Sequence, residues 1–234
     1  VVTGVSTGIG WAITKSLSQH GFHVFGSVRK QADADRLARE FGAAFTPLLF
    51  DVTDEAAVHA AARLVRQRLN GQTLAGLVNN AGVAVPGPLL HLPIAELRQQ
   101  LEINVTGQVI VTQAFAPLLG ADRSLQGKPG RIVNISSVAG KMAMPFVGPY
   151  AMSKHALEAF SESLRRELLL YGIDVIIIGP GSIVTPIWEK AEKLDITPFL
   201  QTDYGNVMGK FRTFMVERGK HGLPAEQMGE LVLH

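Results

Sequence analysis

The amino-acid sequence predicts an α/β protein in which a doubly wound parallel sheet forms one domain of three layers. Three observations support this fold class. Short apolar segments alternate with helix-length segments, and a glycine-rich turn joins the first strand to the first helix. Charged residues make up only 18% of the 234 residues, against a typical share of about 25%. A sheet covered by helices on both faces explains the alternation, and such a sheet, an oligomer interface or both explain the low charge.

The predicted strands are short, apolar on both faces and rich in branched residues, as buried parallel strands require. They occupy residues 1–3, 22–28, 44–50, 74–79, 131–136 and 173–178. The helices predicted between them occupy residues 9–20, 36–41, 54–69, 104–119 and 150–171. Gly21 is placed to end the first helix, and Arg66 and Arg68 lie near the end of the third, as the helix dipole favours. We therefore expect residues 1–234 to form a single domain.

The segment 182–220 departs from this alternation. It combines glycines and prolines with aromatic residues, among them Trp188, Tyr204, Phe211 and Phe214. A long aromatic insertion late in an open α/β domain predicts a lid over a substrate cleft. A surface helical excursion or an oligomer contact is the alternative.

The composition excludes several functions. The net charge of +2 arises from 22 basic and 20 acidic residues spread along the chain, which gives no support for a nucleic-acid partner. The absence of cysteine excludes disulfides, thiolate catalysis and cysteine metal sites, and we expect no bound metal. No apolar run approaches the ~20 residues of a membrane span. The chain opens inside a predicted strand, so we expect residues before Val1, and we expect a cytoplasmic location.

The turn after the first strand predicts a phosphate site. Its sequence is Thr-Gly-Val-Ser-Thr-Gly-Ile-Gly, and its glycines allow the backbone to turn tightly and approach a pyrophosphate at a helix N-terminus. An ordinary glycine-rich turn is the alternative, but the position between a strand and a helix favours a dinucleotide. The predicted contacts are Gly4, Ser6, Thr7, Gly8, Ile9 and Gly10.

The end of the second strand bears on the choice between NAD and NADP. An acidic residue there would favour NAD, and a basic residue would favour the 2′-phosphate of NADP. Arg29 and Lys30 stand there, and the first acid is Asp33. Because Arg29 can make a forked contact with a phosphate, the sequence favours NADP over NAD. A solvated pair of charges is the alternative.

Two further strand ends carry candidate cofactor contacts. Asp51 and Val52 follow the third strand, where a side chain could accept a hydrogen bond from adenine; alternatively, Asp51 or Thr53 caps the next helix. The fourth strand ends in Asn79, Asn80, Ala81 and Gly82, whose small residues would let the backbone pass close to a ribose. The asparagine side chains would tie neighbouring strands, and a plain Asn/Gly turn is the alternative.

Tyr150 and Lys154 are four residues apart in a predicted helix, so their side chains share one face. Ionising a tyrosine at neutral pH requires about 3 pKa units, or about 4 kcal/mol. A lysine cation ~5 Å away supplies roughly 3 kcal/mol at an effective dielectric constant of about 20, and an oxidised nicotinamide adds positive charge. Ser137, at the end of the fifth strand, can hydrogen-bond a substrate oxygen, whereas Ser136 points to the other face.

Taken together, these motifs resemble the short-chain dehydrogenase/reductase family. The resemblance covers nearly the whole chain, at Thr3 to Gly10, Asp51, Asn79 to Gly82, Asn104, Ser137, Tyr150, Lys154, Pro180, Gly181 and Thr185. Ser137 precedes Tyr150 by thirteen residues, which is the family's usual spacing. Gly179 departs from the pattern, because an asparagine often stands before Pro-Gly. The resemblance implies a Rossmann fold.

The resemblance also implies a role for each matching residue. Tyr150 would be the general acid/base, Lys154 would lower its pKa and bind the nicotinamide ribose, and Ser137 would orient the substrate oxygen. Asn104 would hold a water that links Lys154 to solvent as a proton relay; from the residue alone, a helix N-cap is the alternative. The remaining implied cofactor contacts are Pro180, Gly181, Ile183 and Thr185.

We therefore expect an NAD(P)-dependent oxidoreductase that transfers a hydride between the cofactor and a small-molecule alcohol or carbonyl substrate. Met142, Met144, Phe146, Val147 and Trp188 favour an apolar substrate. An epimerase that reuses the Tyr-Lys pair is one alternative. A non-catalytic nucleotide sensor or scaffold on the same fold is the other. The resemblance further implies a homodimer or homotetramer through the helices at 104–119 and 150–171.

Overall fold

A parallel sheet forms the centre of the molecule, and the computed structural model describes residues 1–234. Its strands are β1 (Val24–Val28), β2 (Phe45–Leu49), β3 (Gly76–Asn79), β4 (Arg131–Ile135) and β5 (Asp174–Ile178). Val2 bridges Gly26 of β1 and Val78 of β3, so the strand order is β2, β1, residues 1–3, β3, β4, β5. The order reverses at residues 1–3, and open α/β sheets bind ligands in the crevice at such a reversal.

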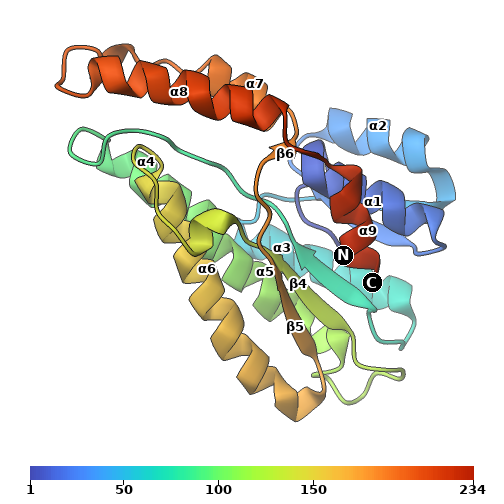
Figure 1. The fold of residues 1–234 in the computed structure, drawn as a ribbon. Helices are drawn as coiled ribbons and strands as arrows, with labels where there is room; N and C mark the ends of the chain where they lie inside the picture. The colour runs from blue at the N-terminus through green and yellow to red at the C-terminus, as the bar shows by residue number, and fades with distance from the viewer.

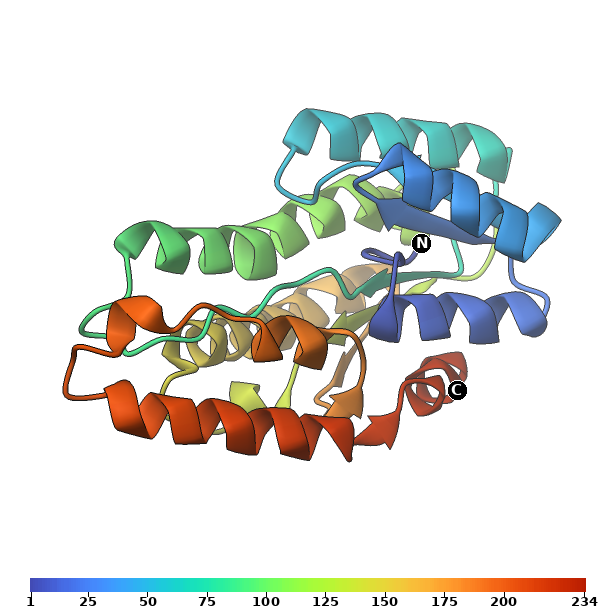
Figure 2. The ribbon, with the colours of Figure 1, turned by 90° about the horizontal axis from the view of Figure 1, so that it is seen from above.

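Helices cover both faces of this sheet, and each face buries its own apolar cluster (Figures 1 and 2). One face carries α1 (Gly8–Gln19), α2 (Gln31–Phe41) and α9 (Glu226–Leu233). The opposite face carries α3 (Glu55–Leu69), α5 (Gly107–Phe115) and α6 (Gly148–Glu167). Ile13 and Leu37 belong to the first cluster, and Val58 and Phe115 belong to the second; all four are fully buried. The prediction of a doubly wound sheet in three layers is confirmed.

The strands agree with the prediction to within two residues at each end, whereas three helices differ. α2 begins at Gln31, five residues before the predicted start. The predicted helix at 104–119 instead ends at Phe115 and continues as a 3-10 turn that contains Pro117. The predicted helix at 150–171 begins at Gly148 and gives way to a 3-10 turn after Glu167.

Between β3 and β4, one helix was not predicted. α4 (Ile94–Leu101) continues through a π-helical turn, Glu102–Thr106, directly into α5. Pro93 at its start and Glu96 in its first turn are ordinary helix-start signals. The apolar periodicity of the sequence does not predict this helix, because its buried face carries the polar Gln100, which is fully buried.

The segment 182–220 contains β6 (Ile183–Val184), α7 (Ile187–Glu192) and α8 (Gly205–Lys220), and β6 pairs with β7 (Leu223–Pro224). Figure 1 shows α7 and α8 together, away from the sheet and beyond α4. α7 lies so close to α8 that a Cβ on Gly219 would overlap the ring of Trp188. A small apolar cluster of Leu92, Ile196, Phe199 and Met208 joins the segment to the stretch after β3.

None of the helices combines the length and apolar character that crossing a membrane requires.

Candidate active site

The phosphate-binding turn needs glycine at the positions that the sequence indicated. Gly4 and Gly8 have φ angles of +70° and +63°, in the left-handed region. A Cβ on Gly4 would lie 2.9 Å from the Cα of Ala81, and a Cβ on Gly10 would overlap the Gly4 carbonyl. Thr7 precedes α1 but its side chain makes no capping bond, so the first N–H groups of the helix are open to a ligand. The turn therefore fits a pyrophosphate.

Neighbouring strands hold the start of this turn. Ser27 Oγ accepts a hydrogen bond from the Gly4 N–H at 3.0 Å. Asn80 Nδ2 donates to the Thr3 carbonyl at 2.8 Å and to the Gly4 carbonyl at 3.2 Å. The Thr3 hydroxyl accepts from the Asn80 and Ala81 N–H groups at 2.9 and 3.0 Å. The side chain of Asn80 thus contacts the turn itself, so any cofactor contact at this residue would come from its backbone.

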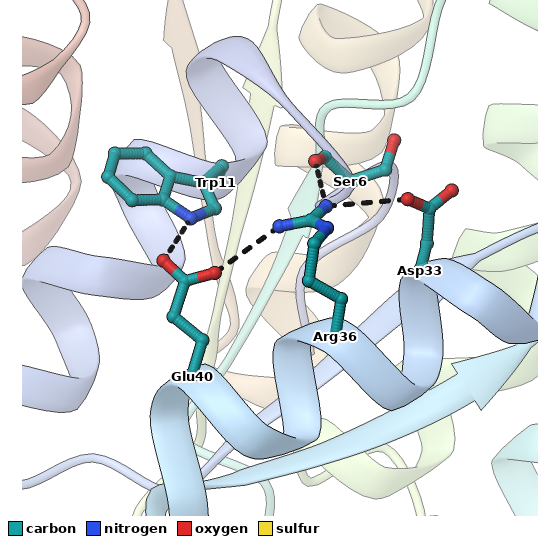
Figure 3. Close-up of polar contacts among 5 residues, drawn as sticks. All are labelled: Ser6, Trp11, Asp33, Arg36 and Glu40. Carbon is teal, nitrogen blue, oxygen red and sulfur yellow. Dashed lines mark hydrogen bonds and ion pairs between the residues drawn. The ribbon is translucent and has the colours of Figure 1, made fainter.

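Arg36 of α2 holds the tip of the turn, a contact that the sequence analysis missed (Figure 3). Its guanidinium donates to the Ser6 carbonyl at 2.6 Å and pairs with Glu40 at 3.2 Å and Asp33 at 3.4 Å. Glu40 also accepts from the Trp11 indole at 2.8 Å. The only signal in the sequence is an arginine with acids three residues before and four residues after it, a pattern that is common on solvated helices.

Arg29 and Asp51 meet at the edge where an adenosine would lie. Arg29 is 67% exposed, and its guanidinium lies 3.5 Å from Asp51. Burial raises the pKa of Asp51, but hydrogen bonds from Thr53 and the charge of Arg29 lower it more, so the carboxyl stays below its usual value. Lys30 is exposed and immediately precedes α2. Asp54 caps α3 by accepting from the Ala57 N–H at 3.0 Å, so the alternative that Asp51 or Thr53 caps this helix is wrong.

A polar stripe on α4 and α5 fixes the segment 79–85 after β3. Its members are four residues apart and no more than 3% exposed: Gln100, Asn104, Gln108 and Thr112. Gln100 bonds to the Val85 N–H at 2.7 Å and the Val83 carbonyl at 2.8 Å, and Gln108 donates to the Ala81 carbonyl. This stripe was not predicted, although its spacing of four residues is visible in the sequence.

Asn79 of β3 joins the last residue of the stripe, Thr112, to the sheet. Its Nδ2 donates to Thr112 and to Asn134 of β4, both at 2.9 Å, which ties β3 to β4 as the sequence indicated. A Cβ on Gly82 would lie 3.2 Å from Asn104 Oδ1, so the backbone passes close to the stripe there. Val52 packs on the opposite side of α5, where a Cβ on Gly107 would lie 2.7 Å from its side chain.

Asn104 lies in the π-helical turn, so the alternative that it caps a helix is wrong. Its side chain accepts from the Val83 N–H at 2.9 Å and donates to the Val83 carbonyl at 2.9 Å. Its second amide hydrogen goes to Ser153 Oγ at 3.1 Å, and Ser153 donates in turn to the Tyr150 carbonyl at 2.7 Å. Asn104 therefore connects the segment 79–85 to the helix that carries Tyr150.

Ser137, Tyr150 and Lys154 come together at the carboxyl end of β4. Ser137 has an extended backbone, and its hydroxyl accepts from the Ala139 N–H at 3.1 Å. Lys154 Nζ donates to the Ile135 carbonyl at 2.7 Å and lies 5.7 Å from the centre of the Tyr150 ring. The side chain of Ser136 lies beside Gly140: a Cβ added to Gly140 would be 2.8 Å from Ser136 Oγ.

The electrostatics of the pair differ from the sequence expectation. Burial raises the pKa of Tyr150, and hydrogen bonding with Ser137 lowers it only in part. Burial lowers the pKa of Lys154 to about 8, against an opposing effect of Glu158. The charge of Lys154 is not among the causes that shift the pKa of Tyr150, and this pKa stays above its usual value.

The stretch after β5 runs along the same edge. The Pro180 carbonyl accepts from the Val138 N–H at 3.0 Å, and the surroundings of Gly181 are open. Thr185 faces the phosphate-binding turn, because a Cβ on Gly8 would lie 3.4 Å from its side chain. Ile183 is buried, and its carbonyl accepts from the Trp188 indole at 2.7 Å.

Aromatic rings link the approach to Tyr150 with α8. Phe146 lies 5.9 Å from Tyr204 and 5.4 Å from Phe211, measured between ring centres and with near-perpendicular ring planes. Phe146 has a φ of +62°, which is strained for a residue with a side chain. Its carbonyl accepts from the Gly87 N–H at 2.7 Å. Phe146 thus connects the stretch just before Tyr150 with the segment 182–220.

A separate apolar cavity of about 470 Å³ lies at the opposite end of the strands, with Val1, Phe22, Leu74 and His234 among its lining residues. None of the predicted site residues lines it. It is therefore not the substrate site.

Comparison with known proteins agrees with this geometry. A family model described as short chain dehydrogenase matches residues 1–195. The NADPH-dependent 3-dehydrocapnine reductase of Ornithobacterium rhinotracheale is 46% identical over 226 residues, which cover 97% of this chain and 79% of that protein. Retinol dehydrogenase 5 of Homo sapiens is 38% identical over 213 residues, covering 87% of this chain and 65% of that protein. The chain thus spans slightly less than two thirds of this second relative.

A solved structure shows the same fold over almost the entire chain. The short chain dehydrogenase/reductase from Burkholderia phymatum, in complex with NAD, has a TM-score of 0.84 and covers 99% of this chain and 83% of its own, at 22% identity. A parallel sheet of this strand order, with a glycine turn where the order reverses, defines a Rossmann-type dinucleotide-binding protein. The chain belongs to the short-chain dehydrogenase/reductase family, whose members are NAD(P)-dependent oxidoreductases acting on CH–OH or C=O groups.

Proposed function

We propose that this protein interconverts an alcohol and a carbonyl compound by a Ser-Tyr-Lys mechanism. The observation that carries the proposal is the meeting of Ser137, Tyr150 and Lys154 at the same sheet edge as the glycine turn. When bound, the nicotinamide cofactor supplies or accepts the hydride, and in its oxidised form it adds positive charge beside the phenol. The residues of the chain must then bind the substrate oxygen and move its proton.

Tyr150 is the proposed general acid/base. During reduction its hydroxyl donates a proton to the substrate oxygen, and during oxidation the phenolate accepts that proton. Ser137 donates a second hydrogen bond to the same oxygen and holds it beside Tyr150. The Ala139 N–H bonds to the Ser137 oxygen, which fixes the hydroxyl in place and leaves its hydrogen for the substrate. The buried Lys154, with a pKa of about 8, can hold or release a proton near neutral pH and supply the charge that a phenolate requires.

We propose that Asn104 supports the proton relay mainly by position. Both of its amide hydrogens are already donated, to Val83 and to Ser153. A relay water would therefore bind the remaining lone pair of Oδ1 or the backbone carbonyl of this π-helical turn, and Lys154 would exchange its proton through it.

NADP is the proposed cofactor. Arg29 is exposed and held by one ion pair of 3.5 Å, so it can turn toward a 2′-phosphate at little cost. Lys30 adds a second exposed charge at this edge. The NADPH dependence of the relative from Ornithobacterium supports this assignment.

The proposed substrate is apolar, and the segment 182–220 is its proposed lid. Leu89 and Met142 are exposed near Tyr150, and a Cβ on Gly148 would lie 2.9 Å from Leu89. Phe146, Tyr204 just before α8 and Phe211 on α8 add aromatic surface at the same place. The similarity to a retinol dehydrogenase supports an apolar substrate.

The first test is titration of the protein with NADPH and with NADH, followed by nicotinamide fluorescence. We expect NADPH to bind more tightly, and we expect apolar ketones to be reduced by the wild type but not by Tyr150→Phe. Binding of neither cofactor would refute the oxidoreductase proposal. Equal turnover by Tyr150→Phe would refute the mechanism and favour another role for the fold.

We also propose a homodimer or homotetramer that packs through α5 and α6. Met152 is an apolar side chain on α6 that is half-exposed in the single chain, as an interface residue would be. Light scattering that gives the mass of one chain would refute this proposal.

A further inference from the structure

We propose that Arg36 is a positioning residue for cofactor binding. It would fix the Ser6 peptide so that the N–H groups of the turn are already arranged for a pyrophosphate. This inference rests on the proposed function, since it concerns how the same cofactor site is held.

The tip of the turn, Ser6 and Thr7, is held by a single side chain. The bonds from Asn80 and Ser27 reach Gly4 at its start, and Val5 is held by the Ser27 carbonyl through its N–H. Arg36 is the one side chain hydrogen-bonded to Ser6 or Thr7. Without it, the Ser6 peptide could rotate, and the turn would lose its arrangement for a ligand.

The guanidinium is itself held in place (Figure 3). Asp33 lies one turn before Arg36 on α2, and Glu40 lies one turn after it. Glu40 is fixed in turn by the Trp11 indole of α1 at 2.8 Å. The network therefore joins α1, α2 and the turn, and it leaves the guanidinium little freedom.

Arg29 and Arg36 consequently have different proposed tasks. Two carboxylates balance the charge of Arg36, whereas Arg29 has one long ion pair and is mostly exposed. Arg29 is free to bind a 2′-phosphate, which only NADP carries. Arg36 acts on the turn that receives the pyrophosphate, which NAD and NADP share.

The two tasks predict different binding patterns. Arg36→Ala should weaken NADPH and NADH about equally, by about tenfold, which corresponds to ~1.4 kcal/mol. Arg29→Ala should weaken NADPH and leave NADH unchanged. Arg39→Ala is the matched control, because Arg39 is an exposed arginine on the same helix and makes no side-chain hydrogen bond or ion pair.

The experiment measures the dissociation constants of both cofactors for the wild type and the three variants by nicotinamide fluorescence, with the melting temperature of each variant beside them. Arg36→Lys, which keeps the charge and one donor, should recover part of the affinity. The inference fails if Arg36→Ala lowers the melting temperature but the folded protein still binds both cofactors with the wild-type affinity. Arg36 would then have a structural role only. Selective loss of NADPH would make Arg36 a phosphate-binding residue and would also overturn the inference.

The outcomes separate this inference from the proposed function. A wild type that binds neither cofactor refutes both. A wild type that binds, with an Arg36→Ala variant that binds equally well, refutes the positioning role alone. Should Arg36→Ala fail to fold, Glu40→Gln removes the ion pair while leaving an acceptor for Trp11, and a loss of affinity for both cofactors is again expected.

Discussion

The phosphate-binding turn and the segment 182–220 lie at the same edge of the sheet but are held by different forces. The turn is held by hydrogen bonds from Ser27, Asn80 and Arg36, and its glycines permit one backbone path. The segment is joined to the body mainly by the apolar contacts of residues such as Phe199 and Met208. Hydrogen bonds are directional, whereas apolar packing tolerates changes of shape that conserve volume. The first arrangement suits the proposed cofactor site, and the second suits the proposed lid.

The largest effect is expected at the chemical step. Tyr150→Phe removes the proton donor and should lower turnover by about 10²–10⁴-fold, because this is the usual contribution of a positioned acid/base. The hydrogen bonds of the turn are unaffected, so the dissociation constant for NADPH should stay within about twofold of the wild type. Single-turnover kinetics and fluorescence titration measure the two quantities. A parallel loss of cofactor affinity would show that chemistry and cofactor binding are not separable.

The next effect concerns the stability cost of Lys154. Its pKa is lowered from 10.5 to about 8 by burial, so between these pH values the unfolded chain binds more protons than the folded chain. The free energy of unfolding should therefore rise with pH across this window, by about 3 kcal/mol from this residue. Tyr150, whose pKa is raised by burial, acts in the opposite direction above pH 10.

Urea unfolding at pH 7.5, 8.5 and 9.5 tests this dependence. Lys154→Met should lose the rise between these pH values and should be the more stable protein at the lowest of them. Identical slopes for the wild type and Lys154→Met would contradict the proposed burial of the charge.

A single methyl group on the turn should have an effect of about 2 kcal/mol. Gly4→Ala places a side chain at a φ of +70°, where an alanine costs roughly 1–2 kcal/mol, and 2.9 Å from Ala81. We expect weaker binding of both cofactors by at least about tenfold. Gly21→Ala is a useful control, because Gly21 also has a positive φ but no atom within 4 Å of the added Cβ. If both variants bind cofactor equally well, the close approach at Ala81 is unimportant.

The smallest effect is expected at Phe146. Its strained backbone is offset by the rings of Tyr204 and Phe211, and both Phe146→Ala and Phe146→Gly remove these contacts. Glycine tolerates a positive φ, so Phe146→Gly should be the more stable of the two by about 1 kcal/mol. Urea unfolding compares them, and Phe214→Ala, an exposed phenylalanine on α8, is the control. A more stable Phe146→Ala would show that the loop relaxes without cost.

The sequence predicted the parts of the site that follow from the backbone. Gly4 and Ser137 lie at the same edge because parallel strands bring their carboxyl ends together, and glycine positions are fixed by backbone geometry alone. Arg36 could not be predicted, because its contact with Ser6 depends on how α2 packs beside the turn. The helices of the segment 182–220 were not predicted either, since their apolar residues pack locally and follow no long period.

The helix α4 was missed for a second reason. An amphipathic helix is recognised by an apolar face, but here the buried face carries Gln100, whose partners are backbone groups of Val83 and Val85. Hydrophobic periodicity does not detect a face that is buried by hydrogen bonding. A search for polar residues at helical spacing would have found it.

The polar stripe on α4 and α5 makes the segment 79–85 dependent on a single helix. Gln100, Asn104 and Gln108 bind backbone groups of the segment, whereas Thr112 accepts from the side chain of Asn79. The contacts run in opposite order along the two segments, from Val85 at Gln100 to Asn79 at Thr112. Loss of one residue between Gln100 and Thr112 would turn the rest of the stripe by about 100° around the helix. The released amides would then be buried without partners, at about 1–3 kcal/mol each. Transplanting this segment into another protein of the same fold would therefore require transplanting the helix with it.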